Sequence, residues 1–175
     1  MLRNISSTAL IVVMLVVLVA GNAQAQSANV SVGATVAAAL SISKTADVAF
    51  GNLSATTAGQ VYLSPTGTGS TYVGVTAAVG ALHIGGAGST SIRLGWPTTV
   101  TLTGPAALTY TLKVNGLNAN TQASSGTLTL SGGYVSVTTG AGGAYYLWVG
   151  GDLGTLSGQT AGSYTGSAAF TVEYN

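Results

Sequence analysis

The side chains that could carry out acid–base chemistry in this sequence are few and lie far apart. There is one histidine, His83, which could form a dyad with Asp47 or Asp152. Hydrolytic mechanisms need titratable groups in pairs, since a nucleophile needs a base and that base needs an orienting partner. The setting of His83, between Leu82 and Ile84, is instead typical of a surface or strand-edge residue. We therefore predict no catalytic residues and no enzyme activity.

Metal and phosphate sites have equally little support. Asp152 follows two glycines and could bind a hard cation, but calcium takes about six to eight oxygens, usually from several carboxylates, so a turn aspartate is favoured. The Gly-rich stretch 67–72 lacks the third glycine of a dinucleotide loop, and no P-loop lysine follows it. The chain has no cysteine, which removes thiolate sites and disulfides. We predict no metal and no cofactor.

The first residues have the pattern of an export signal. Arg3 gives a positive start, Thr8–Ala20 is an uncharged apolar run, and Ala23-Gln24-Ala25 is a small-residue cleavage site. The run is shorter than the roughly 18 apolar residues expected of a membrane span. We expect a cleaved signal peptide at 1–25 and one exported domain at 26–175. This domain would not insert into a membrane, and would cross the periplasm to the cell surface or beyond.

Charge excludes several classes of partner for the exported part. Beyond Arg3, three cations and three acids remain, so the formal charge is three minus three, or zero. No basic field is then available for nucleic acid or anionic lipid. Charged residues make up 4% of the chain, against about 25% in ordinary domains. Little electrostatic repulsion keeps copies apart, so self-association is favoured.

The exported part alternates between strand-forming and turn-forming residues. Val, Thr, Tyr, Ile and Leu fill short runs, and glycines cluster at the joints. Short strands at this spacing predict an all-β, antiparallel sandwich. The expected strands are 30–43, 47–50, 60–64, 71–76, 91–94, 99–103, 108–114, 126–130, 134–138, 145–149 and 163–174.

Both ends of the exported part alternate with a period of two residues. Near the C-terminus one side carries Tyr164, Gly166, Ala168, Phe170, Val172 and Tyr174. Near the N-terminus the even positions are Val30, Val32, Ala34, Val36, Ala38, Leu40 and Ile42. At about 3.3 Å per residue the N-terminal run spans on the order of 40 Å, about twice a usual strand. Either it breaks into two strands, or part of it has no place in its own sheet.

Three stretches resemble a family of secreted bacterial domains, domain of unknown function 4402, and more distantly the spore-coat-U-like subunits of archaic chaperone–usher pili. These stretches are 42–53, 147–153 and 161–175, the last preceded by Gln159. The resemblance implies an immunoglobulin-like, Greek-key sandwich completed by donor-strand exchange, in which the N-terminal extension of one subunit fills the groove of another. It also implies a periplasmic chaperone, which reads the penultimate Tyr174 and the upstream Gly162, and an outer-membrane usher.

These observations predict a structural subunit of an extracellular fibre, pilus or cell-surface assembly, whose partners are copies of itself joined head to tail. An N-terminal extension at about 26–34 begins the donor, whose apolar residues are Val30, Val32, Val36, Leu40 and Ile42. The groove and terminal strand are assigned to Gly162, Tyr164, Ala168, Phe170, Val172 and Tyr174.

The alternative is a monomeric, secreted immunoglobulin-like domain that adheres to carbohydrate or another surface. Trp96 and the run Tyr145-Tyr146-Leu147-Trp148 would form its aromatic platform, although half of any alternating strand must face the core. In this alternative, residues 26–43 pack entirely into their own sheet.

Overall fold

The computed structural model describes residues 30–175 of the chain. It divides between Thr35 and Val36, so residues 30–35 are described separately from the body that follows. The expected signal peptide, residues 1–25, lies outside the described residues, as do residues 26–29 of the expected extension.

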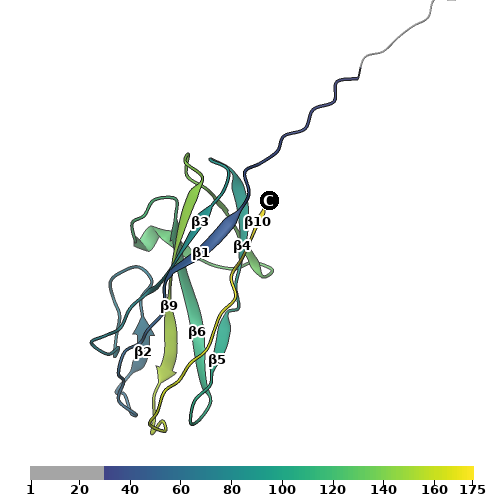
Figure 1. Ribbon diagram of the computed structural model, residues 1–175. Helices are drawn as coiled ribbons and strands as arrows, with labels where there is room; N and C mark the ends of the chain where they lie inside the picture. Colours follow the sequence, from purple (N-terminus) through teal and green to yellow (C-terminus); the bar gives the residue numbers. More distant parts are fainter. Residues whose placement is uncertain (1–29) are drawn as a thin grey trace, which may run out of the picture. The chain divides into compact units, whose positions relative to one another are not determined.

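The larger sheet contains seven antiparallel strands (Figure 1). Its path is β1-β3-β9-β6-β5, while β2 also pairs with β9 and β7 also pairs with β6. The bounds are β1 Ser41–Ala46, β2 Gln60–Leu63, β3 Gly80–Gly85, β5 Thr99–Leu102, β6 Leu108–Leu117, β7 Thr127–Leu128 and β9 Ala144–Thr155. The long strands β6 and β9 form its centre, where they pair over seven residues from Thr111–Leu117 to Tyr146–Asp152.

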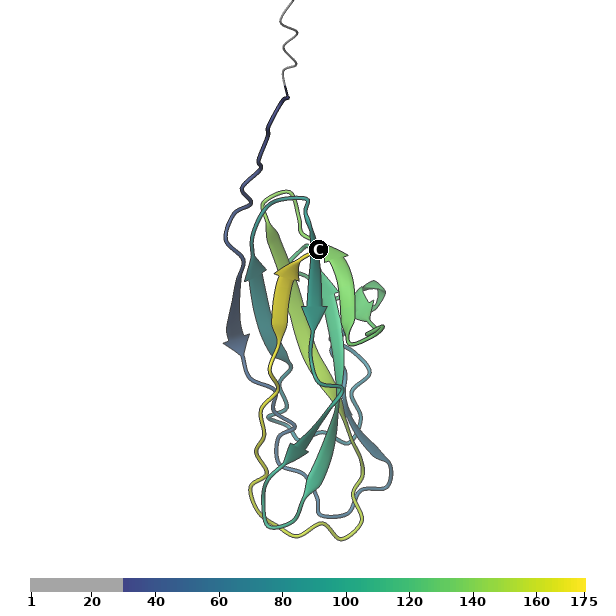
Figure 2. The same ribbon diagram turned by 90° about the vertical axis from the view of Figure 1, so that its right-hand side faces the viewer.

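The smaller sheet has three antiparallel strands in the order β10-β4-β8. These are β4 Ser91–Gly95, β8 Tyr134–Thr138 and β10 Thr171–Tyr174. In Figure 2 the yellow arrow of β10 lies beside β4, and a long irregular trace leads up to it.

The core lies between the two sheets. Ile84 and Leu147 of the larger sheet pack with Ile92 and Leu94 of the smaller one, and all four side chains are almost wholly buried. A second cluster, built around Val61, Leu112 and Val149, continues the core toward β2 and β5. The expected all-β antiparallel sandwich is therefore confirmed.

Some elements differ from those predicted. A strand that was not expected, β3, runs between Gly80 and Gly85 and pairs with both β1 and β9. By contrast, the expected strands 47–50 and 71–76 are reduced to isolated bridges at Ala49 and Thr71. The segment 47–50 has a backbone neighbour on one side only, and its other side borders the groove described below.

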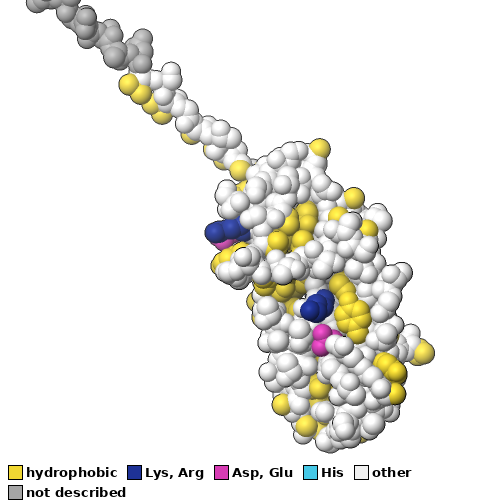
Figure 3. Space-filling model, turned by 180° about the vertical axis from the view of Figure 1, so that it is seen from behind, with side chains coloured by type: hydrophobic (Ala, Val, Ile, Leu, Met, Phe, Trp, Pro, Cys, Tyr) yellow, Lys and Arg dark blue, Asp and Glu magenta, His cyan; other side chains and the backbone are white. Residues whose placement is uncertain are grey.

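Helical structure in the described part of the chain is limited to the 3-10 turn η2 at Ser124–Gly126. Between residues 30 and 175, no helix is long and apolar enough to cross a membrane. Figure 3 shows a face on which charged side chains are sparse and polar or backbone surface predominates, as the low charged fraction predicts.

Candidate functional site

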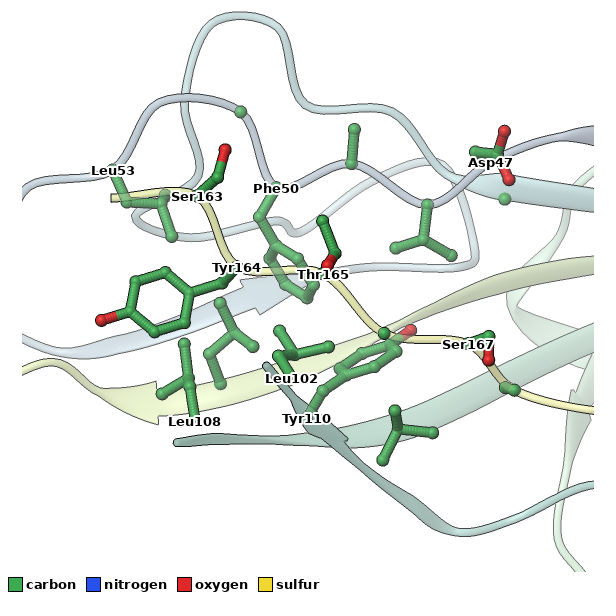
Figure 4. A pocket seen from close by; sticks show the side chains of 18 of the residues that line it. Asp47, Phe50, Leu53, Leu102, Leu108, Tyr110, Ser163, Tyr164, Thr165 and Ser167 are labelled. Carbon is green, nitrogen blue, oxygen red and sulfur yellow. The ribbon is translucent and has the colours of Figure 1, made fainter. Parts of the chain in front are cut away.

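An apolar groove with a volume of about 890 Å³ opens along the body (Figure 4). One wall is formed by residues 46–55, which begin at the last residue of β1, and the other by residues 162–170, which we call the terminal segment. Its floor consists of side chains from the larger sheet and the chain beyond β9: Val100, Leu102, Leu108, Tyr110, Leu112, Val149, Leu153 and Leu156.

The floor is uncharged as well as apolar. The Tyr110 ring packs edge to face against Phe50 of the 46–55 wall, with ring centroids 5.4 Å apart. The Tyr110 hydroxyl donates a hydrogen bond of 2.7 Å to the Gly150 carbonyl. Burial, and to a smaller degree the nearby Asp152 carboxylate, raises the pKa of Tyr110 well above its usual value. The phenol stays neutral, so it is held in place without adding charge to the floor.

The 46–55 wall has no ladder partner on its groove side. Between Asp47 and Ser54 its backbone bonds run to residues outside the groove lining, from Ala49 to Ala78 and from the Gly74 amide to the Phe50 carbonyl, while at the end of the wall the Ala55 carbonyl accepts a 2.8 Å bond from the Gln159 amide. Gly51 has a φ of +75°, and an added Cβ there would lie 2.9 Å from the Gly74 Cα. Glycine is therefore required at this close approach. The wall is therefore bonded to the segment around Gly74 and Ala78 on one side, and its other backbone edge lies beside the groove.

The terminal segment also has few backbone hydrogen bonds to neighbouring strands. Its one bridge within the described chain joins Thr165 to Thr103, with N···O distances of 2.7 and 3.0 Å. From Gly166 to Phe170 it has no strand partner among residues 30–175. An added Cβ at Gly166 would lie 2.7 Å from Leu102 Cδ2, so glycine lets this backbone rest directly on β5. The predicted strand 163–174 was therefore too long, because within the described residues only Thr171–Tyr174 pairs as a strand, β10.

The predicted groove residues divide into two groups. Gly162, Tyr164, Ala168 and Phe170 line the groove. Val172 and Tyr174 do not, because β10 pairs with β4 and they pack in the other core cluster. Phe170 lies at the boundary between the two and stacks on Trp96, with centroids 5.9 Å apart.

The predicted donor residues also divide. Val30, Val32 and Val36 are 84%, 92% and 94% exposed. No ladder includes residues 30–40, so part of the long N-terminal alternation has no place in the sheet of its own molecule. Leu40 and Ile42 instead pack on their own core, and Ile42 pairs with Ile84 of β3. Of the five predicted donor residues, only Val30, Val32 and Val36 are therefore exposed, while Leu40 and Ile42 are already packed in their own body.

Several groove residues were not singled out from the sequence, notably Phe50, Leu102, Leu108 and Tyr110. Alternation placed each of them on an apolar side of its segment. It could not distinguish a closed core from an open groove, because both have the same apolar pattern.

The aromatic run on β9 does not form an exposed platform. Tyr145 is buried, Trp148 is only 9% exposed, and Trp96 is partly buried against Phe170. Tyr146 remains half-exposed beside His83, with ring centroids 5.0 Å apart. These aromatic side chains contribute mainly to packing.

The two aspartates considered above as His83 partners have different neighbours. Asp47 accepts a 2.6 Å bond from Lys44 on β1, while Asp152 lies opposite Thr111 on β6. Within residues 30–175, no group of three or more His, Asp or Glu side chains is arranged to hold a metal.

Comparison with known families gives a match over most of the chain. The family described as Domain of unknown function (DUF4402) matches residues 40–174. No curated protein matches the sequence. The match begins at Leu40, where the body begins to bury its N-terminal side chains, and it covers β1 to β10. The exposed valines lie before it.

Proposed function

Because this chain belongs to the DUF4402 family, a domain of unknown function, we propose its function from the groove itself: it is a non-enzymatic structural subunit of an extracellular fibre or cell-surface assembly. Residues 30–36 of one copy lie as a strand in the groove of the next. One observation carries this proposal. The body has an apolar groove whose two walls have no ladder partner on the groove side within residues 30–175, while the same chain exposes three valines that no ladder includes.

The donor and the groove fit in length. At about 3.3 Å per residue, Val30 to Val36 spans about 20 Å, and the bare stretch Gly166–Phe170 spans about 13–17 Å. Full burial of the three valines contributes roughly 4–9 kcal/mol, at about 1.5–3 kcal/mol each. Backbone bonds to the bare walls add affinity, and the alternate side chains set the register.

A second copy is a better donor than the chain's own extension. Any turn that brought the extension back onto its own body would have to form just before β1, at Ala37-Ala38-Ala39. That sequence contains no Gly, Pro, Asn or Asp, the residues that tight turns favour. An extension from another molecule meets no such turn.

The contact joins different surfaces of two copies, so it propagates into a filament rather than closing as a dimer. Export fits this role, and we propose that the subunit crosses the periplasm after signal cleavage. An unfilled groove is an aggregation hazard in transit, which is the problem that a chaperone strand, followed by transfer at an usher, would solve.

Electron microscopy of the chain beginning at Gln26, beside a chain lacking residues 26–36, tests the proposal. We expect filaments from the first chain and folded monomers from the second. Monomers from both at high concentration would overturn it, as would filaments from both.

A further inference from the structure

The proposed function does not say how freely two joined subunits move relative to each other. We propose that Tyr174, the penultimate residue, is a positioning residue that anchors the base of the donor and so makes the joint between subunits stiff. This inference rests on the proposed function, and concerns the geometry of the fibre rather than the occupancy of the groove.

The Tyr174 hydroxyl connects two distant parts of the chain. It donates a 2.6 Å hydrogen bond to the Ala38 carbonyl and accepts a 2.7 Å bond from the Ala87 amide. Ala38 lies just before the strand that opens the body, and Ala87 follows β3. One phenol from the last strand therefore ties the start of the body to an internal loop.

The loop that holds this hydroxyl is itself fixed. The Ala87 carbonyl accepts a 2.7 Å bond from the buried Thr139 hydroxyl, and the neighbouring Gly86 amide bonds to the Gly143 carbonyl at 2.9 Å. With both of its backbone polar groups bonded, Ala87 gives the Tyr174 hydroxyl a rigid support, and through it the Ala38 carbonyl.

The Tyr174 hydroxyl is also closely packed by its neighbours. An added Cβ at Gly86 would lie 3.0 Å from the Tyr174 Oη and 2.8 Å from Leu40 Cδ2. Leu40 and Tyr174 belong to the same apolar cluster. The backbone from Ala38 to Leu40 is thus held by a hydrogen bond at one end and by packing at the other.

The position of this anchor determines its effect. Ala37 alone separates the anchored Ala38 from Val36, the last exposed valine of the donor. If Val36 lies in the neighbouring groove, a single residue links two bodies. Without the Tyr174 bond, residues 37–39 would all belong to the linker, and a longer free linker samples more orientations.

The test uses the chain beginning at Gln26 and the substitution Tyr174→Phe, with Tyr134→Phe as its control. Tyr134 lies on β8 of the same three-stranded sheet, is 43% exposed and is not one of the groove-lining residues. Filament persistence length is measured by electron microscopy. A second measurement reports on the groove alone. The donor valines of each variant are also changed to Asp, and the affinity of that protein for a synthetic peptide of residues 26–36 is measured.

We expect Tyr174→Phe filaments to be severalfold more flexible or markedly shorter, with unchanged peptide affinity, and Tyr134→Phe filaments to remain as stiff as the parent. Equal stiffness in all three, or a changed peptide affinity in Tyr174→Phe, would overturn the positioning role. Failure of the peptide to bind the parent would instead overturn the proposed function. If Tyr174→Phe does not fold, Gly86→Ala, which keeps the phenol but crowds it, is subjected to the same measurements with the same criteria.

Discussion

Single side chains of the N-terminal extension can be changed without disturbing the core. Val32 is 92% exposed, and surface substitutions away from special features usually change stability by less than about 0.5 kcal/mol. We expect Val32→Asp to leave the melting temperature of the monomer unchanged and to abolish filaments, because a buried, unpaired carboxylate in the groove is costly. Thermal unfolding and electron microscopy measure the two effects.

Thr35→Asp is the matched control for this substitution, since Thr35 is exposed and lies on the opposite side of the alternation. It adds the same charge to the same extension. Filaments should persist with Thr35→Asp. Their loss in both variants would show that charge, rather than the apolar side of the donor, governs assembly.

Tyr145 makes a prediction about alkaline pH. Burial raises the pKa of Tyr145 from the usual 10 to about 12. Since the folded pKa lies above the unfolded one, the associated stability is present below pH 10 and is lost as the pH rises toward 12. The shift corresponds to on the order of 2 kcal/mol.

Replacing the phenol should remove this dependence. We expect Tyr145→Phe to match the parent near pH 8 and to exceed it in free energy of unfolding at pH 11.5, as measured by denaturant titration. The same decline with pH in both proteins would contradict the assignment. Tyr110, whose pKa is also raised, contributes a remaining decline in both.

At the level of elements, the bare stretch Gly166–Phe170 predicts that a strand supplied within the same chain would stabilise the body. Joining a copy of residues 26–36 after Asn175 through a flexible linker, and removing the native extension, should give a monomer. We expect its free energy of unfolding to rise by a few kcal/mol, because the gain from burying the valines is partly offset by ordering the strand.

A version of this fused chain with Asp in place of its three valines provides the control. Chemical denaturation and size-exclusion chromatography compare the two. If the apolar fused strand stabilises the body no more than the acidic one does, the groove is not a strand acceptor.

The sequence predicted the elements unevenly, for physical reasons. The range 134–138 coincides with β8, and 60–64 and 99–103 differ from β2 and β5 by one residue, because these runs alternate between turn signals. β3 was missed because His83 and its flanking glycines weaken an alternation whose apolar members are Leu82 and Ile84. Alternation in the terminal segment was detected, but alternation alone does not show whether a backbone edge is paired, and within residues 30–175 the stretch Gly166–Phe170 is not.

The same limit applies to the groove. Gly162, Tyr164, Ala168 and Phe170 were identified from their period alone, and all four line it. The opposite wall was not identified, because its place there depends on the long-range contact between Gly51 and Gly74. Likewise, the alternation 30–42 does not show where the free extension ends. That point is set by tertiary contacts of Leu40 and Ile42.

At the level of the whole molecule, stability should depend weakly on ionic strength. The ion pairs within residues 30–175 are Lys44–Asp47 and Arg93–Glu173, and their side chains are 42–78% exposed. Exposed pairs contribute about 0–1 kcal/mol each and are screened by salt. We expect the free energy of unfolding to change by no more than about 1 kcal/mol between low salt and about 1 M NaCl. A steep fall in denaturation experiments would reveal an electrostatic contribution that these contacts do not explain.

The small number of lysine and arginine residues also affects how readily trypsin-like proteases can cleave the folded protein. Beyond Arg3, trypsin-like proteases have three basic residues to recognise, and Lys44, Arg93 and Lys113 all lie within strands β1, β4 and β6. The loops, where proteolytic nicking concentrates, contain none in the described chain. The folded body therefore presents such enzymes with no cleavable loop, and becomes a substrate only when its sheets open.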